Sequence, residues 1–292
     1  MKPAWFDYYA PRSLDEALRL LDEAGPDGRV LAGGQSLVPM LNLRVLRPSV
    51  VVDINRIEEL GRLEAGSNSL TIGATVRHAE LLRNPVVREG WPLLSEATTQ
   101  VAHIAIRNRG TVCGSVSHND PSAEHPTVLV TLGGTVLIAS AQGRRELPAE
   151  EFLTGMLSNA LEPGEMVVGL RYPRPKPGTA TAFVEFARRL GDFAIAGAAT
   201  ALTMRDGVCE SARLTISGMG HGPFRAKAAE AMLAGRVIND ADIEDAAASA
   251  AEAVEPEEDV HASAAYRRHL AVVMASRALH AAFARTKGQH VG

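Results

Sequence analysis

The segment RVLAGGQSLVPML, residues 29–41, constrains the fold of this chain more than any other segment does. An apolar run with the character of a strand enters the pair Gly33–Gly34, and a segment with helical spacing begins near Ser36. Glycine lacks a Cβ atom, so the backbone can adopt positive φ and turn its N–H groups toward a ligand. A helix that starts at such a turn adds free N–H donors and a favourable dipole end. The segment therefore predicts a binding site for a phosphate or diphosphate group.

A second segment of the same character, RNRGTVCGSVSHNDPSAE, occupies residues 107–124. A glycine pair after a strand is by itself typical of an ordinary tight turn, so neither loop alone decides the question. Two such loops in one chain favour a binding site for a single long phosphorylated cofactor.

The cysteine and histidine content argues against a metal centre in this chain. Only two cysteines occur, Cys113 and Cys209, whereas an iron–sulfur cluster needs four thiolates or a set completed by histidine. The nine histidines form no helical pair and no cluster with cysteine, which makes a structural zinc site improbable. We expect no metal ligands here, and any iron–sulfur centre must lie on another chain.

Charge and hydropathy argue against two kinds of partner, nucleic acid and the membrane interior. The net charge of −4 and the scattered arginines form no basic stripe, so nucleic acid is not an expected partner. The N-terminal residues lack an apolar signal core, and the longest apolar stretch, residues 128–139, is too short to span a bilayer. We therefore predict a cytoplasmic protein without a membrane span.

At 292 residues, the chain is long enough for two or three compact units. A capping box at Ser13–Glu16 predicts a helix that Gly25-Pro26 ends. Together with strands at 30–31 and 50–54, this helix predicts a small lobe of residues 1 to about 57. A second lobe, residues 58–175, is expected to contain a hairpin over 63–75, helices near 78–82 and 92–101, and a strand at 135–139.

The run PRPKPG, residues 173–178, is the best linker in the chain, because alternating prolines favour extended structure and stop helices and sheets. We predict a first domain of residues 1–175 and a C-terminal domain of residues 179–285. The C-terminal domain is expected to be an antiparallel sheet followed by three helices. Its strands are predicted at 182–187, 194–204 and 212–217, its last helix at about 262–284, and a frayed tail at 285–292.

These segments closely resemble a known family. The residues that carry the resemblance are AGGQSL (32–37), PMLNLR (39–44), IRNRGTVCGS (106–115), NDPSAE (119–124), RRLGDFAIAG (188–197), PFRAKAAE (223–230) and ASAAYRRHL (262–270). They match, in order and over nearly the whole chain, the flavin-carrying medium subunit of bacterial molybdenum hydroxylases. That family includes carbon monoxide, nicotine and xanthine dehydrogenases. The resemblance implies an α+β protein, with a two-lobe FAD-binding domain of the vanillyl-alcohol-oxidase (PCMH) type before the C-terminal sheet and helices.

The resemblance also assigns cofactor-binding residues. Backbone N–H groups of the first loop would line the FAD pyrophosphate, with Ser36 as helix N-cap, and the second loop would hold the same cofactor. These residues are Ala32, Gly33, Gly34, Gln35, Ser36 and Leu37 in the first loop, and Thr111, Val112, Cys113, Gly114 and Ser115 in the second. Asp120 and Glu124 match positions near the adenosine part, although either could instead cap a helix near Pro121. Arg188 and Asp192 match a segment near the flavin, although they could equally form a capped turn between strands.

The chain departs from the family pattern at two places. Cys113 stands where glycine is common, and it is either a small buried residue or a thiol near the flavin. Residues 184–187 lack a lysine that many members place close to the flavin, unless Arg188 or Arg189 replaces it. The GMGHG run at 218–222 resembles a dinucleotide-binding turn but lacks the full spacing, so we interpret it as a loop at the flavin rim or the partner surface.

The resemblance implies an FAD-containing oxidoreductase subunit with no catalytic residue of its own for substrate. It would pass electrons from two [2Fe-2S] clusters on a small subunit to an external acceptor. The molybdopterin-type cofactor would lie on a large subunit, in a dimer of heterotrimers. Two alternatives remain open from the sequence: a self-contained FAD-dependent oxidoreductase of the same fold, and a non-redox scaffold in which the glycine loops are only turns.

Overall fold

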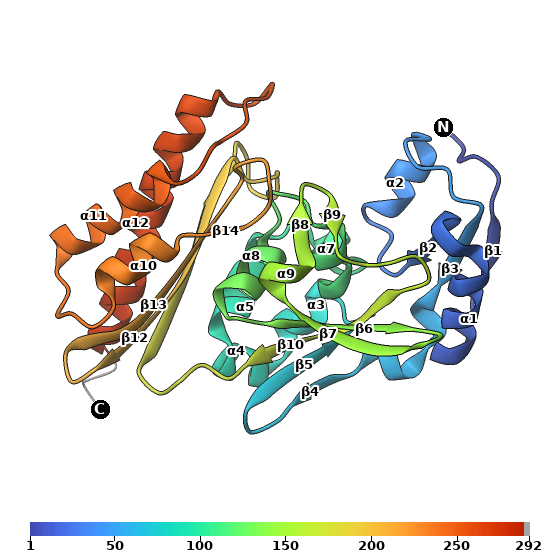
Figure 1. Ribbon diagram of the computed structural model, residues 1–292, viewed down its shortest axis with the longest axis horizontal. Helices are drawn as coiled ribbons and strands as arrows, with labels where there is room; N and C mark the ends of the chain where they lie inside the picture. Colours follow the sequence, from blue (N-terminus) through green and yellow to red (C-terminus); the bar gives the residue numbers. More distant parts are fainter. Residues whose placement is uncertain (289–292) are drawn as a thin grey trace.

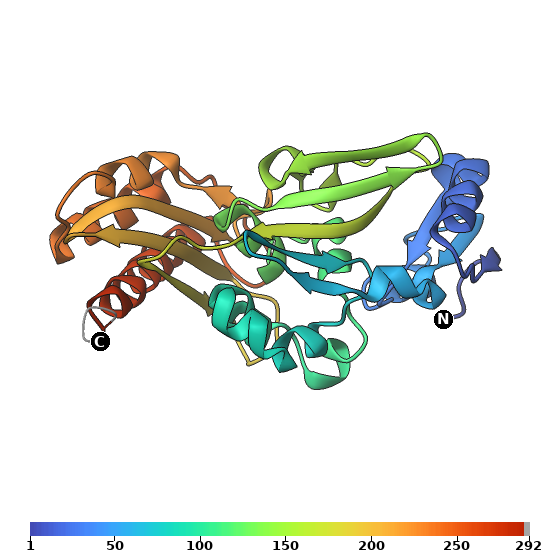
Figure 2. The ribbon, with the colours of Figure 1, turned by 90° about the horizontal axis from the view of Figure 1, so that it is seen from below.

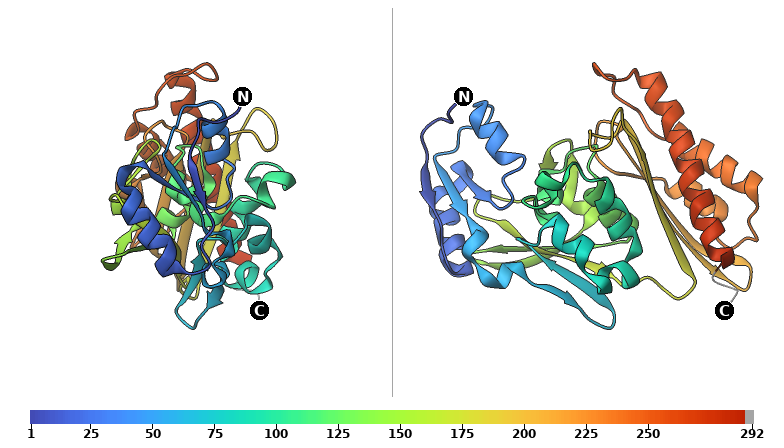
Figure 3. Two further views of the ribbon diagram at one scale, coloured as in Figure 1. Left: turned by 90° about the vertical axis from the view of Figure 1, so that its right-hand side faces the viewer. Right: turned by 180° about the vertical axis from the view of Figure 1, so that it is seen from behind.

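The computed structural model describes residues 1–288, and the chain forms three units arranged along one long axis (Figure 1). Seen from below, a small N-terminal lobe is followed by the middle sheet with its helices and then by the C-terminal sheet (Figure 2). The N-terminal lobe and the last helix therefore lie at opposite ends of the molecule (Figure 3).

The N-terminal lobe is a three-stranded parallel sheet in the order β1-β3-β2, packed against helix α1. The hydroxyl of Ser13 accepts a hydrogen bond from the Glu16 N–H, so α1 begins at the predicted cap, and Gly25 with φ of 55° ends it. The elements are β1 (Asp7–Tyr9), α1 (Leu14–Ala24), β2 (Gly28–Leu31), α2 (Leu37–Asn42) and β3 (Val50–Asp53), with 3-10 turns at Gly25–Asp27, Ile54–Arg56 and Glu58–Gly61.

The second lobe is built on an antiparallel sheet in the order β4-β5-β10-β6-β7. Both N-terminal lobes share one hydrophobic core, whose largest fully buried side chain is Trp91. The strands are β4 (Leu63–Ala65), β5 (Ser69–Gly73), β6 (Thr135–Ser140), β7 (Gly143–Pro148) and β10 (Met166–Pro173), with a small hairpin of β8 (Leu153–Gly155) and β9 (Ser158–Asn159). The helices are α3 (His78–Arg83), α4 (Pro85–Gly90), α5 (Pro92–Gln100), α6 (Ile104–Arg107), α7 (Val112–His118), α8 (Glu124–Thr131) and α9 (Ala149–Phe152).

The C-terminal unit is a four-stranded antiparallel sheet in the order β11-β12-β13-β14 with three helices. The helices cover one face of the sheet (Figure 3), and the strands also contact α5 and α8 of the second lobe. Alanines dominate β12, α11 and the buried side of α12, which lets helix and sheet approach closely. The elements are β11 (Thr179–Phe186), β12 (Ala196–Arg205), β13 (Val208–Ser217), β14 (Phe224–Arg225), α10 (Lys227–Leu233), α11 (Asp240–Glu252) and α12 (Ala264–Gly288).

The tail prediction was wrong for residues 285–288, which continue helix α12. Arg285 forms two hydrogen bonds of 2.8 Å with the Glu96 carboxylate of α5, and Thr286 is buried. These contacts with the second lobe extend the helix beyond the point where its apolar spacing stops. The rest of the predicted tail, residues 289–292, lies outside the described residues. None of the helices within residues 1–288 combines the length and apolar character needed to cross a membrane.

Candidate cofactor site

The first glycine loop turns between β2 and α2. Gly34 has φ of 70°, a left-handed conformation that favours glycine, and the Gln35 side chain donates to the Gly33 carbonyl at 2.9 Å. Ser36 occupies the N-cap position of α2 as expected, but its side chain makes no capping hydrogen bond. The helix is six residues long, so the turn itself, rather than a long helix dipole, defines this loop.

Five successive N–H groups of this loop have no acceptor in the described part of the chain. They belong to Gly33, Gly34, Gln35, Ser36 and Leu37, and the first loop bond to the following helix is from the Val38 N–H to the Gly34 carbonyl at 3.1 Å. Backbone N–H groups that find no partner in the protein need one from solvent or a ligand. A run of this length suits the several oxygens of a diphosphate.

The second glycine loop is the start of helix α7 rather than an open loop. Thr111 is the N-cap, and its hydroxyl accepts from the Gly114 N–H at 3.0 Å. A Cβ atom on Gly114 would lie 2.6 Å from that hydroxyl oxygen, so glycine permits the cap. The Val112 N–H donates to the Val76 carbonyl at 3.2 Å, which anchors the helix start to the entry of α3.

Cys113 is the small buried residue of the two alternatives. Its side chain is 2% exposed, and its Sγ lies 3.5 Å from the carbonyl oxygens of Ile72 and Gly73. Burial raises the pKa of the thiol well above its usual range, so the thiolate does not form near neutral pH. Cys113 is not among the residues with positive φ, because the position is already helical.

The backbones of the two glycine loops lie against each other at Gly33. A Cβ atom on Gly33 would lie 2.7 Å from the Arg109 carbonyl oxygen, 2.7 Å from the Gly110 Cα and 3.0 Å from the Thr111 nitrogen. The structure thus brings the two sets of predicted loop residues together, with Gly33 next to the backbone of residues 109–111.

Two buried histidines, His78 and His125, pack next to the second loop, and they were not identified as site residues from the sequence. The His78 Nδ1 and the His125 Nε2 are 3.0 Å apart in stacked rings, and a Cβ on Gly110 would lie 2.9 Å from the His78 ring. Burial, followed by the charges of Arg107 and Arg77, lowers the pKa of His78 to about 4, so the ring is neutral at neutral pH. The only signal in the sequence was a histidine at the predicted start of a helix.

Asp120 and Glu124 lie where the second lobe meets the C-terminal unit. The Asp120 carboxylate accepts from the Ser122 N–H at 2.9 Å, which closes a turn before α8. Neither carboxylate caps α8, since its N-cap is Ala123 without a side-chain hydrogen bond and Glu124 is its first residue. Burial, then the neighbouring Glu185 and Asp120 charges, raises the pKa of Glu124 to about 8. Burial also raises the pKa of Glu185 to about 7, and its Oε2 is buried without a partner among the described residues.

Arg188 and Asp192 are exposed on the loop between β11 and β12. A turn closes there through the Asp192 N–H and the Arg189 carbonyl at 3.1 Å, and no hydrogen bond within residues 1–288 joins these two side chains to either glycine loop. The loop does reach the second lobe, because a Cβ on Gly191 would lie 2.5 Å from the His103 ring. Residues 184–187, where many family members have a lysine, carry a carboxylate instead, that of Glu185.

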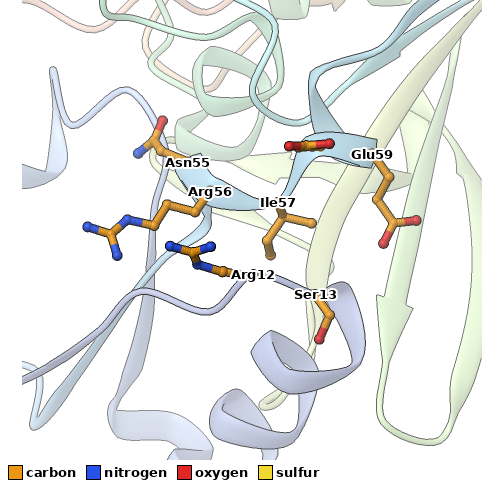
Figure 4. A pocket seen from close by; sticks show the side chains of 7 residues that line it. Arg12, Ser13, Asn55, Arg56, Ile57 and Glu59 are labelled. Atoms are coloured by element: carbon orange, nitrogen blue, oxygen red, sulfur yellow. The ribbon is translucent and has the colours of Figure 1, made fainter.

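A cavity on the N-terminal lobe is lined by none of the predicted loop residues. Arg12 and Arg56 extend toward the same side of it (Figure 4), and Glu58 and Glu59 balance their charges. Because the charges cancel and no glycine turn faces it, this cavity does not have the features of a diphosphate site. It is lined by Arg12, Ser13, Asn55, Arg56, Ile57, Glu58 and Glu59.

A two-lobed domain with free loop N–H groups, joined to an antiparallel sheet with three helices, defines an FAD-binding flavoprotein. Comparison with family models agrees over most of the chain. Residues 4–175 match the FAD binding domain in molybdopterin dehydrogenase, and residues 181–282 match the CO dehydrogenase flavoprotein C-terminal domain. The chain belongs to the family of FAD-carrying medium subunits of molybdenum hydroxylases.

Individual relatives match end to end. The 6-hydroxypseudooxynicotine dehydrogenase complex subunit alpha of Paenarthrobacter nicotinovorans is 42% identical over 98% of this chain and 97% of its own length. Caffeine dehydrogenase subunit beta of Pseudomonas sp. (strain CBB1) is 40% identical over 96% and 95%. Among solved structures, a chain of carbon monoxide dehydrogenase from Hydrogenophaga pseudoflava superposes with a TM-score of 0.95 at 37% identity, covering 98% of this chain and 99% of that one.

These findings confirm the predicted family, the α+β fold and FAD as the cofactor of this chain. They also confirm its class as the FAD-containing electron-transfer subunit of a multi-subunit molybdenum hydroxylase.

Proposed function

We propose that the FAD diphosphate is held where the two glycine loops meet. The observation that carries this proposal is the run of five N–H groups from Gly33 to Leu37 that find no acceptor within residues 1–288, next to the start of α7. Backbone donors bind an anion without a side-chain charge, so the lack of charged side chains in residues 32–37 and 111–115 is no obstacle. The cofactor-binding residues in this proposal are Ala32, Gly33, Gly34, Gln35, Ser36 and Leu37, with Thr111, Val112, Cys113, Gly114 and Ser115.

Within this site each residue type has a separate task. Gly34 provides the left-handed turn, and Gln35 holds the turn closed through the Gly33 carbonyl. Thr111 fixes the start of α7, while Cys113 fills the core beneath it and contributes only its backbone. When bound, FAD supplies the ability to take up electrons singly and to release them in pairs.

We infer further contacts for two carboxyl groups and for the β11–β12 loop. With its pKa raised to about 8, Glu124 is largely protonated at neutral pH and can donate as well as accept a hydrogen bond toward an adenosine hydroxyl. Asp120 stands beside it in the same turn. Arg188 and Asp192 are proposed to approach the flavin end, which rests on the family resemblance and on the contact of their loop with the second lobe.

We propose that residues 1–175 form the FAD-binding domain, in lobes of about 1–57 and 58–175, and residues 179–285 the C-terminal flavoprotein domain. Strand β10 ends at Pro173 in the middle sheet and β11 begins at Thr179 in the next, which supports a boundary between them.

We also propose assembly with a large subunit that holds a molybdopterin-type cofactor and a small subunit with two [2Fe-2S] clusters. The complex would be a dimer of heterotrimers in the cytoplasm. Large apolar side chains stand exposed on two segments that touch each other, which supports coverage by a partner. They are Ile104, Leu190 and Phe193, at 69%, 80% and 74% exposure.

The test compares the isolated chain with the co-expressed three-subunit complex. Flavin, iron and molybdenum content are measured for both, together with reduction of an artificial acceptor by a panel of N-heterocyclic and aldehyde substrates. We expect FAD in both preparations but substrate-dependent turnover only in the complex. Turnover by the isolated chain would overturn the subunit assignment in favour of a self-contained flavoenzyme, and a chain without affinity for FAD would refute the proposed site.

A further inference from the structure

We propose that Asn55 and Arg77 form a clamp that fixes the spacing of the two glycine loops, so that FAD affinity depends on two side chains outside both loops. They are positioning residues. The inference rests on the proposed cofactor site, since it concerns how that site is held in shape.

The first half of the clamp belongs to the N-terminal lobe. The Asn55 Nδ2 donates to the Ala32 carbonyl at 2.8 Å, immediately before Gly33. The same amide is held by Asp53, whose Oδ1 accepts from the Asn55 N–H at 2.9 Å and from the Asn55 Nδ2 at 2.5 Å. The Tyr8 hydroxyl donates to the other oxygen of Asp53 at 2.5 Å. Asn55 is therefore held in one orientation, with its carbonyl oxygen free to accept from another residue.

The second half belongs to the second lobe. The guanidinium of Arg77 donates to that oxygen of Asn55 and also to the Arg109 carbonyl. The backbone of Arg77 forms a bridge with Thr111, and the His78 N–H donates to the Gly110 carbonyl at 3.1 Å. Arg77 therefore moves with the second loop, while its side chain reaches across to the lobe that carries the first.

The two ends of the clamp, at the Ala32 and Arg109 carbonyls, lie next to the contact between the loops at Gly33. Ala32 precedes Gly33, and the Arg109 carbonyl is the atom that a Cβ on Gly33 would approach to 2.7 Å. Gly33 has no side chain with which to hold this distance. The hydrogen bonds through Asn55 and Arg77 are thus the side-chain link that ties the Ala32 carbonyl to the Arg109 carbonyl.

The charge of Arg77 strengthens this link. No carboxylate within residues 1–288 forms an ion pair with it, so its donors go to Asn55 and to a backbone carbonyl instead. Burial is the main cause of a lowered pKa for Arg77, yet the guanidinium stays charged at neutral pH. Hydrogen bonds from a charged donor are stronger than neutral ones. A loop pair fixed before the cofactor arrives also loses less conformational freedom on binding.

The experiment measures FAD affinity in the deflavinated full-length chain by quenching of flavin fluorescence. The variants are Asn55→Ala, Arg77→Met, the double variant and Arg77→Lys, and the control is Arg171→Met. Arg171 is also an arginine with two side-chain hydrogen bonds, at 2.7 and 2.8 Å to Glu146, but it lies on β10 and contacts neither loop. We expect each single variant to weaken FAD binding roughly tenfold to a hundredfold. The double variant should lose less than the product of the two single losses, because both act through one link.

Two further readouts separate positioning from general stability. Hydrogen exchange of the Val38 amide and of residues 109–115, where the amides have hydrogen-bond acceptors, should become faster in the apo chain of the clamp variants but not in Arg171→Met. Arg77→Lys, which keeps the charge and can reach one acceptor, should recover part of the affinity, and it keeps the test valid if Arg77→Met does not fold. Wild-type affinity and unchanged loop exchange in Asn55→Ala and Arg77→Lys would overturn the clamp. Failure of the wild-type chain to bind FAD would instead overturn the proposed site.

Discussion

The contact at Gly33 leads to a quantitative prediction for Gly33→Ala. The added Cβ would lie 2.7 Å from two backbone atoms of the second loop, whereas ordinary contact begins at 3.4 Å. Backbone atoms cannot rotate away, so the loops must separate by about 0.7 Å, and overpacking of this kind costs about 1–3 kcal/mol. If FAD binds only when the loops are close, that energy appears as a loss of affinity of roughly 5- to 150-fold.

The assay is FAD titration of the deflavinated chain, with the thermal midpoint of the apo chain measured in parallel. Gly61→Ala is the matched control, because its Cβ would meet only the Thr75 hydroxyl at an ordinary 3.5 Å. We expect the control to behave like the wild type, and Gly33→Ala to bind FAD more weakly and to have a lower apo midpoint, because Asn55 and Arg77 already hold the loops together in the apo chain. Wild-type affinity together with a wild-type midpoint in Gly33→Ala would refute the view that FAD requires the loops in contact.

Three further predictions concern the cofactor and the buried titratable groups. Acid precipitation should release FAD into the supernatant, because the proposed site holds it through backbone donors; flavin retained in the pellet would contradict non-covalent binding. Between about pH 7 and 8 the free energy of unfolding should fall as pH rises, because burial raises the pKa of Glu124 to about 8 and of Glu185 to about 7, so the folded chain binds more protons than the unfolded one. At lower pH the buried His78, whose pKa is lowered to about 4, acts in the opposite direction. Urea unfolding of Glu185→Gln at several pH values should show a shallower dependence, and an unchanged slope would count against this cause. Cys113 and Cys209 are both buried with raised thiol pKa values, so neither should react with a thiol reagent until the chain unfolds; fast modification of the native chain would place one of them at an accessible surface.

The sequence by itself determined the local features of this protein. The Ser13 cap, the turn at Gly34 and the helix start after Thr111 follow from residue types whose backbone preferences act over a few neighbours. The order of strands and helices in the C-terminal unit was likewise predictable, because period-two and helical apolar patterns are local. The two glycine loops and FAD as the cofactor class could therefore be predicted, and FAD is confirmed by the family match.

Only the tertiary structure decided how those features meet. Gly33 lies against the backbone at Arg109, and the hydrogen bond between Asn55 and Arg77 spans the two lobes. Both contacts join residues that are far apart in sequence. The same holds for the burial of Cys113, whose thiol packs against the carbonyls of β5. It also holds for the end of α12. There Arg285 is hydrogen-bonded to the Glu96 carboxylate, and the helix continues past the residues whose apolar spacing predicted it. Periodicity and capping act within a single segment, whereas these contacts arise only when separate segments pack together, and so no local pattern encodes them.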